Sequence, residues 1–190
     1  MQRPTVCNAL DTLLVHADIA SRYLPLIASE WAKAGVEMHC DQRALAILKS
    51  QTGLKLAPAT MEDWGKEFLA LVAAIKVVDS LDAALDHISH YGSGHSEAIV
   101  TEEYAAAMRF LNEVDAACVY FNASTRFTDG GQFGLGAEVG ISTNKIHARG
   151  PVGLEGLVIY KWKLIGDGQI VADYSGAAGK RFTHRRIDTD

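Results

Sequence analysis

Short apolar runs alternate with helix-like segments through the first 123 residues, and this alternation limits the possible folds more than any other feature. Apolar runs of this length predict buried strands. They lie at 12–16, 36–40, 73–80, 96–101 and 117–123. Repeated strand–helix units are typical of an α/β fold with a twisted, mainly parallel sheet flanked by helices.

The segments between these runs carry helix periodicity and helix end signals. The first predicted helix, 18–35, is expected to begin at an Asp18 cap and to stop at Gly35. Its expected apolar stripe is Ile19, Tyr23, Leu24, Ile27 and Trp31. Further helices are predicted after Asp41, over 81–92 with a stripe of Leu81, Ala84, Leu85 and Ile88, and over 102–114 with Thr101 at its start. Residues 50–62 are predicted to form a loop, and 154–166 a strand or extended arm.

Composition and charge argue against several classes of protein. The chain has a net charge of −5 and no basic–aromatic interleaving, so we expect no nucleic-acid partner. Its basic residues at 180–186 are predicted to form a solvated tail. No apolar run is long enough to cross a membrane and no signal peptide opens the chain, which favours a cytoplasmic protein without membrane contact.

The cysteines and histidines do not predict a metal site. Cys7, Cys40 and Cys118 lie far apart without a CxxC pair, so neither a disulfide framework nor zinc is expected. His87, His90 and His95 are close together but lack a carboxylate–histidine pattern, and we interpret them as ordinary surface or core residues.

Two segments carry candidate chemistry. Cys7 lies in a Pro-led turn, and a helical start after this turn would aim backbone N–H groups at the sulfur and at an oxyanion. A plain buried cysteine is the alternative from local sequence. The second segment, 124–153, is rich in glycine and lacks periodicity, as functional loops do. It is neither a dinucleotide fingerprint nor a P-loop. Arg126 either pairs with a ligand's carboxylate or phosphate or closes the loop through Asp129.

These same segments identify a resemblance. The stretches "RPTVCNALDT", "HYGSGHSEAIVT" and "NASTRFTDGGQFGLGAEVGISTNKIHARGPVGLEGL" closely resemble the γ-glutamyl phosphate reductase family (glutamate-5-semialdehyde dehydrogenase) of the aldehyde dehydrogenase superfamily. The similarity runs from about residue 2 to about residue 170. It implies NADPH-dependent reduction of L-glutamyl 5-phosphate to L-glutamate 5-semialdehyde and phosphate, a step of proline biosynthesis. The resemblance makes Cys7 the nucleophile, which forms a thioester that accepts hydride from NADPH.

The resemblance also implies roles for other residues. Arg126, Ser124 and Asn122 would hold the negative groups of the substrate, and Phe127 and Phe133 would wall its pocket. Glu67 stands where the superfamily has a glutamate that contacts the nicotinamide ribose. The Phe-Gly-Pro that usually follows that glutamate is absent, so a packing or surface role for Glu67 stays open.

The resemblance finally predicts the domain organisation. Residues 1–165 would form the aldehyde-dehydrogenase-like catalytic domain and 166–190 a C-terminal arm. In the family a nucleotide-binding domain precedes the cysteine, so we expect it to be absent from this chain, which would be inactive alone. Two other hypotheses stay open: a non-catalytic oligomerisation or structural remnant that uses the apolar 156–166 segment in a homo-oligomer, and a thiol that is acylated without reduction.

Overall fold

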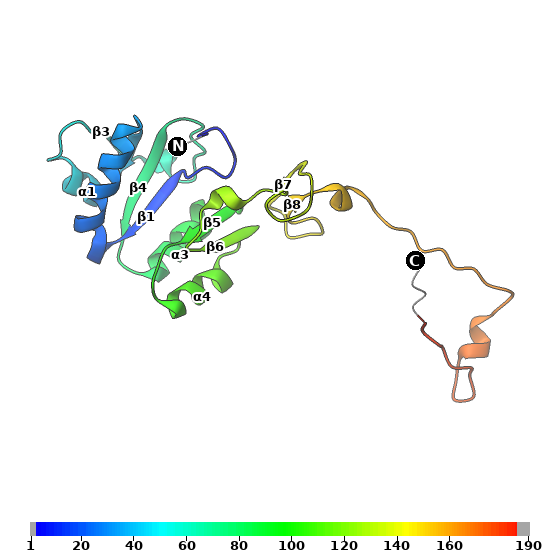
Figure 1. Ribbon diagram of the computed structural model, residues 1–190. Helices are drawn as coiled ribbons and strands as arrows, with labels where there is room; N and C mark the ends of the chain where they lie inside the picture. The colour runs from blue at the N-terminus through cyan, green and yellow to red at the C-terminus, as the bar shows by residue number, and fades with distance from the viewer. Residues whose placement is uncertain (1–2, 186–190) are drawn as a thin grey trace. The chain divides into compact units, whose positions relative to one another are not determined.

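The computed structural model describes residues 3–185 and divides the chain into two compact units, Met1–Val158 and Ile159–Asp190 (Figure 1). The first unit holds all the α-helices and β-strands of the described residues. The domain boundary predicted from the resemblance, between residues 165 and 166, stays a prediction.

A four-stranded parallel sheet is the centre of the first unit. Its strands are β1 (Thr12–His16), β2 (Glu37–Cys40), β3 (Lys55–Pro58) and β4 (Val72–Val78), in the order β1-β4-β2-β3. All the pairings are parallel, which confirms the predicted α/β class. The prediction of a loop over 50–62 is wrong at β3 and at a short 3₁₀ turn, Met61–Asp63. Strand β3 is a short edge strand that ends in proline, a pattern that resembles a loop in sequence.

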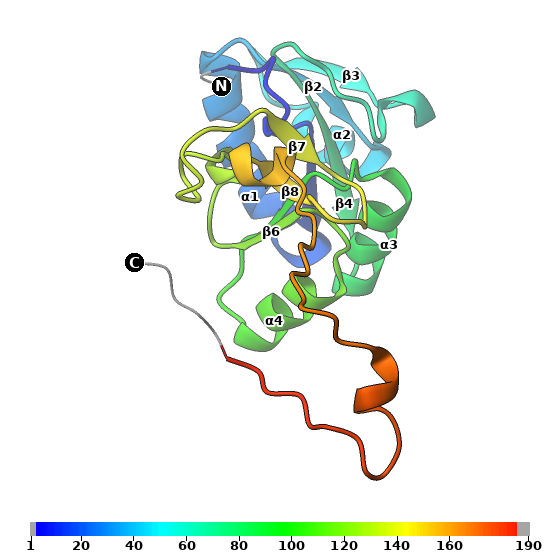
Figure 2. The same cartoon turned by 90° about the vertical axis from the view of Figure 1, so that its right-hand side faces the viewer.

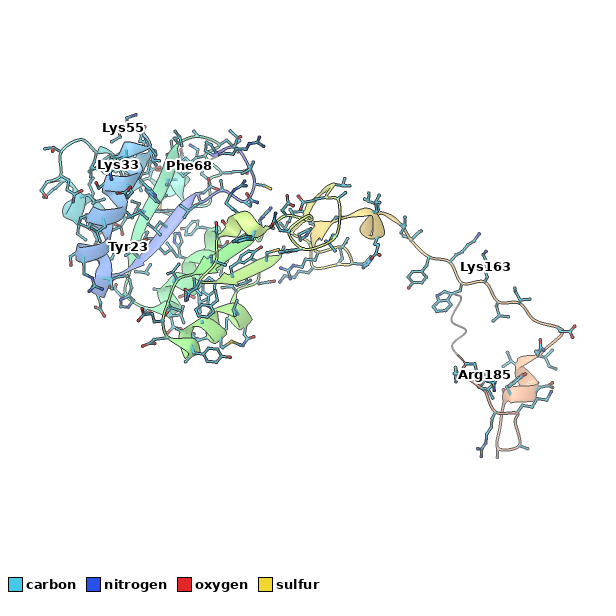
Figure 3. All side chains as sticks on the ribbon, in the orientation of Figure 1. Tyr23, Lys33, Lys55, Phe68, Lys163 and Arg185 are labelled. Atoms are coloured by element: carbon cyan, nitrogen blue, oxygen red, sulfur yellow. The ribbon has the colours of Figure 1, made fainter. Side chains whose placement is uncertain are left out.

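Helices α1 (Ala17–Lys33) and α2 (Gln42–Leu48) pack against each other and against this sheet (Figures 1 and 2). The buried residues of α1 are Ala20, Leu24, Ala28 and Trp31. The predicted stripe is therefore wrong at Ile19 and Tyr23, which are 40% and 38% exposed; Figure 3 labels Tyr23. Small alanines face the sheet because they let the helix backbone approach it closely.

The helix ends follow local hydrogen bonds. Asp41 caps α2 as predicted, with its carboxylate accepting from the Ala44 N–H at 2.7 Å. Asp18 is not the cap of α1, because the helix begins one residue earlier and the His16 ring accepts from the Asp18 N–H at 3.2 Å. The aspartate lies in the first turn instead, where its charge suits the helix dipole.

Helix α3 (Leu81–Tyr91) lies on the opposite face of the sheet. Side chains alternate along β4, so Lys76 points away from the α1 side, and its Nζ lies 3.1 Å from Nδ1 of His87 on α3. His87 is the buried residue of this helix, whereas the predicted apolar stripe at 81, 84, 85 and 88 is only half-buried. The helix ends before Gly92, as predicted.

Strands β5 (Ser96–Ile99) and β6 (Cys118–Phe121) form a second parallel sheet with helix α4 (Tyr104–Glu113) between them in the sequence. Ser96 pairs with Cys118 and Ala98 with Tyr120 in register, which places these side chains on one face. The predicted start of α4 at 102 is too early, since Thr101 accepts from the Glu103 N–H ahead of the helix.

Residues 124–153 are mostly irregular, as predicted, but contain a 3₁₀ turn, Thr125–Phe127, and a small antiparallel pair, β7 (Gly140–Ser142) and β8 (Gly150–Val152) (Figure 2). The segment 154–166 begins with a 3₁₀ turn, Leu154–Leu157, and contains no strand, so only the extended form of that prediction holds.

The second unit has little regular structure. It contains a 3₁₀ turn, Val171–Tyr174, and Lys180 forms an ion pair with Asp173 of this turn at 2.8 Å. Figure 3 labels Lys163 and Arg185 in this unit. Arg186, the last of the predicted basic tail, lies outside the described residues. No helix among residues 3–185 is long and apolar enough to cross a membrane.

Candidate functional site

Cys7 lies in a turn that is closed by a hydrogen bond from the Ala9 N–H to the Val6 carbonyl at 2.9 Å. Its side chain is exposed, whereas that of the next residue, Asn8, is 7% exposed. The expected helical start is wrong, because the turn leads into β1 and α1 begins only at Ala17. Helix-terminal N–H groups are therefore not the source of any activation of this thiol.

Asn8 joins the cysteine turn to the glycine-rich loop through three contacts. Its Nδ2 donates to the Thr128 carbonyl at 2.9 Å, and its own carbonyl accepts from the Thr125 hydroxyl at 2.9 Å. Its Oδ1 accepts from Nη1 of Arg126. Side chain and backbone of one residue thus bind the whole 125–128 turn. The structure therefore brings together the two segments that the sequence analysis selected independently.

Arg126 extends from the exposed side of this junction. The alternative in which it closes the loop through Asp129 is wrong, because the Arg126 guanidinium donates to Asn8, and the Asp129 carboxylate accepts from the Gly131 N–H at 2.8 Å. Ser124 caps the turn by accepting from the Arg126 N–H at 3.2 Å. The guanidinium keeps several N–H donors beyond the one given to Asn8, so it can still receive a carboxylate or phosphate.

The other residues predicted to contact substrate lie around this turn with different environments. Phe127 and Phe133 are 54% and 45% exposed, on the same loop as Arg126. Asn122 has a positive φ of 50°, and its amide pairs with both backbone groups of Thr101, at 3.0 Å and 2.9 Å. Asparagine tolerates that conformation because its side chain can bond locally. Its amide stabilises the ends of β5 and β6 and is not free for a ligand.

Glu67 is exposed and lies on a segment tied to the end of the cysteine turn. The Phe68 N–H donates to Oδ1 of Asp11 at 3.1 Å, and Asp11 lies just after the turn of Cys7, before β1. Burial raises the pKa of Asp11, the bond from Phe68 opposes this, and the charge of Glu67 adds to the increase. Figure 3 labels Phe68 near the start of β4. Glu67 and Cys7 therefore both lie on segments that lead into the amino ends of neighbouring parallel strands, β4 and β1.

Thr128 is a central residue that the sequence analysis missed. It is 2% exposed, and its Oγ1 lies 2.6 Å from Oγ of Ser96 and 2.7 Å from the Tyr120 hydroxyl. Ser96 in turn contacts Nδ1 of His95 at 2.7 Å. Threonine in a polar loop gives no periodic signal, so nothing local distinguishes it from an exposed residue. Its burial requires the second sheet to lie beneath the loop.

The remaining thiols and histidines do not form a second reactive site. Cys40 and Cys118 are buried in strands, as predicted. Burial, helped by the charge of Asp41, raises the pKa of Cys40 to about 11, and burial also raises the pKa of Cys118. Among residues 3–185, no cluster of three or more histidine, cysteine or acidic side chains could hold a metal ion.

The described residues do not fit a complete dinucleotide. Pyrophosphate sites of this kind use a glycine-rich turn between a strand and a helix. Helix α1 follows β1 directly, α2 follows β2 through Asp41, and α3 follows β4 through Asp79 and Ser80. None of these connections contains glycine, so Glu67 would have to contact the nucleotide without a phosphate cradle from this chain.

A parallel sheet with helices on both faces and a thiol-bearing turn at the amino end of β1 together define an α/β unit of the aldehyde dehydrogenase type. An acetylating aldehyde dehydrogenase from Geobacillus thermoglucosidasius shares this fold, with a TM-score of 0.55 at 15% identity over 87% of this chain and 46% of that one. No protein-family model matches the chain.

Closer similarity is to γ-glutamyl phosphate reductase. The crystal structure of that enzyme from Thermotoga maritima matches with a TM-score of 0.82 and 51% identity, over 89% of this chain and 40% of that one. The γ-glutamyl phosphate reductase of Dehalococcoides mccartyi (strain BAV1) is 68% identical over 170 residues, 90% of this chain. The chain is therefore a homologue of part of these reductases, and it spans 40% of the length of the Dehalococcoides relative.

Proposed function

We propose that this chain supplies the nucleophile of an NADPH-dependent γ-glutamyl phosphate reductase, which converts L-glutamyl 5-phosphate into L-glutamate 5-semialdehyde and phosphate in proline biosynthesis. The observation that carries this proposal is the contact between the turn of the exposed Cys7 and the loop of Arg126. A thiol and a cation on one surface suit an acyl phosphate, whose carbonyl is electrophilic and whose leaving group is anionic.

The chemistry of this chain's own residues is acyl transfer. The Cys7 thiolate attacks the acyl carbon of the mixed anhydride, a carbon–sulfur bond forms, and the carbon–oxygen bond to phosphate breaks. The electron pair of that bond leaves on the phosphate. Arg126 neutralises part of the charge of the bound substrate, and the guanidinium N–H groups that it does not give to Asn8 orient the substrate. The exposed rings of Phe127 and Phe133 offer apolar contact to the methylene groups of the substrate.

In the whole reaction NADPH supplies hydride to the thioester when it is bound. Because the described residues lack a phosphate cradle, the chemistry that we assign to this chain ends at the thioester. Glu67 is the residue of this chain that we propose to contact the nucleotide, at its ribose.

A second candidate function is self-association, favoured by one observation. The segment Val158–Ile165 exposes large apolar side chains, with Ile159 at 95%, Trp162 at 91% and Leu164 at 94% exposed. An extended apolar segment of this kind buries its surface when it meets another protein surface. A homo-oligomer is the partner that we propose for it.

Acid-quenched mass spectrometry tests the main proposal. The chain is incubated with L-glutamyl 5-phosphate and, separately, with acetyl phosphate, and the peptide containing Cys7 is examined for an acyl adduct that hydroxylamine removes. We expect a glutamyl thioester on Cys7, and none on Cys40 or Cys118. The Cys7→Ser variant is the control. A chain that stays unmodified, or that is modified equally in the Cys7→Ser variant, would contradict the role of Cys7.

A further inference from the structure

We propose that Asn8 is a positioning residue that holds the Arg126 guanidinium beside the Cys7 turn, and that the resulting charge selects anionic acyl substrates. The inference deepens the proposed function and rests on it for the role of Cys7. Neither the resemblance nor the sequence pattern singles out Asn8. Its three contacts with the 125–128 turn do.

Only an asparagine-like side chain satisfies both partners of Asn8. Its Nδ2 donates to the Thr128 carbonyl, and its Oδ1 accepts from Arg126. An aspartate would keep the Arg126 contact but would place a second carboxylate oxygen against the Thr128 carbonyl, where two acceptors repel. An alanine would leave a buried carbonyl and a guanidinium without these partners. The burial of Asn8, 7% exposed, makes each loss costly.

On the side away from Asn8, the 125–128 turn is held by hydrogen bonds to the second sheet, so Asn8 contacts a turn that is itself anchored. Thr128 is held by hydroxyl contacts to Ser96 on β5 and Tyr120 on β6, which share one face of the second sheet. The backbone between Thr125 and Thr128 is further closed by a bond from the Thr128 N–H to the Thr125 carbonyl at 2.9 Å. Arg126 lies inside this closed turn. The second sheet therefore holds the turn that carries Arg126, and Asn8 holds the guanidinium next to the turn of Cys7.

The charge should discriminate between neutral and anionic electrophiles at Cys7. Two unit charges about 5 Å apart in water-like surroundings attract enough to change a rate about fourfold. An anionic reagent should gain that factor at Cys7, and a neutral reagent of the same shape should not. Salt should weaken the effect because exposed charges are screened.

Iodoacetate and iodoacetamide provide the matched pair of probes. In both reactions the thiolate displaces iodide from the same CH₂ carbon, so a carbon–sulfur bond forms and iodide leaves with the bonding electrons. The measured quantity is the ratio of the two alkylation rates at Cys7, resolved by peptide mass spectrometry on the 190-residue chain. A ratio is insensitive to changes in thiolate fraction, which affect both reagents equally.

We expect the ratio to fall about fourfold in Arg126→Gln and by a similar factor in Asn8→Ala. Asn8→Asp should lower it further, because that variant adds a negative charge while it keeps the space filled. Asn112→Ala is the matched control. Asn112 is exposed on α4, and its side chain makes no hydrogen bond to another of the residues 3–185. In the unchanged chain the ratio should fall towards that of Arg126→Gln at 1 M salt.

Circular dichroism identifies any variant that does not fold. If Asn8→Ala does not fold, Thr125→Val tests the same junction, because it removes only the hydroxyl contact to the Asn8 carbonyl. A ratio equal to that of the unchanged chain in folded Asn8→Ala, or in Thr125→Val where Asn8→Ala does not fold, would overturn the positioning role, as would a lowered ratio in Asn112→Ala. Loss of glutamyl transfer with an intact iodoacetate ratio would contradict the proposed reductase and leave the positioning role standing.

Discussion

The Nδ2 of Asn8 donates a hydrogen bond to the Thr128 carbonyl at 2.9 Å, across 120 residues of sequence. This bond joins the turn of Cys7 to the loop of Arg126. The Thr128 hydroxyl in turn contacts Ser96 on β5 and Tyr120 on β6, the two strands of the second sheet. The turn that carries the thiol and the loop that carries the Arg126 cation are therefore joined by hydrogen bonds.

Cys7 should be the most reactive thiol of the chain. It is exposed, whereas Cys40 and Cys118 are buried, and burial raises the pKa of both. We expect iodoacetamide near neutral pH to label Cys7 at least about tenfold faster than either of the others. Peptide mass spectrometry of the native chain measures the three rates. Labelling of Cys40 at a rate comparable to that of Cys7 would count against the nucleophile.

Arg126→Ala should impair acyl transfer more than folding. The lost charge-assisted contact with an anionic substrate is worth about 2 kcal/mol, so glutamyl transfer to Cys7 should slow about thirtyfold. The lost bond to Asn8 should also cost about 1 kcal/mol of unfolding free energy. Urea titration and acid-quenched mass spectrometry measure the two effects. Arg22→Ala, an exposed change on α1, is the control; an unchanged transfer rate in Arg126→Ala would exclude an anchoring role.

This chain should fold yet neither bind NADPH tightly nor reduce substrate with it. The core around β4 is closed by helices on both faces, which supports independent folding. No strand–helix connection in residues 3–185 offers a glycine-rich phosphate cradle, and hydride transfer requires the nicotinamide to be held about 3–3.5 Å from the reacting carbon. Fluorescence titration with NADPH and an assay of phosphate-dependent semialdehyde oxidation test this. Micromolar binding or turnover would show that the nucleotide site has been misplaced.

Acid should destabilise the fold through His87. Burial, with the charges of Lys76 and His90, lowers the pKa of His87 from its ordinary value of 6.5 to about 4. The unfolded chain then binds more protons than the folded one between these values, so this stabilising contribution is complete above about pH 6.5 and is lost as the pH falls towards 4. Between pH 7 and pH 5 the loss should be on the order of 2 kcal/mol.

Urea midpoints at the two pH values measure this loss. In His87→Gln the acid-induced decrease should be smaller, since the amide oxygen can accept from Lys76 but does not titrate. His147→Gln, in an exposed part of the loop, should leave the decrease unchanged. Equal acid sensitivity of both variants would assign the effect to other groups.

The local elements could be predicted because their signals are local. Apolar runs marked β1, β2 and β4, the Asp41 cap marked α2, and Gly92 marked the end of α3. Strand β3 escaped prediction because an edge strand ending in proline has neither an apolar run nor alternation. The stripe of α1 was displaced because two alanines, and not the larger Ile19 and Tyr23, face the sheet.

The sequence by itself determined the α/β class, the turn of Cys7 and the irregular loop of Arg126, since each depends on residues within a few positions of one another. Only the tertiary structure decided that Asn8 and not Asp129 receives Arg126, that Thr128 is buried, and that the Asn122 amide is occupied by Thr101. Such pairings form between segments as much as 120 residues apart. Hydrogen bonds between distant polar side chains leave no periodicity in the sequence, because they depend on how the two sheets and the loop pack together.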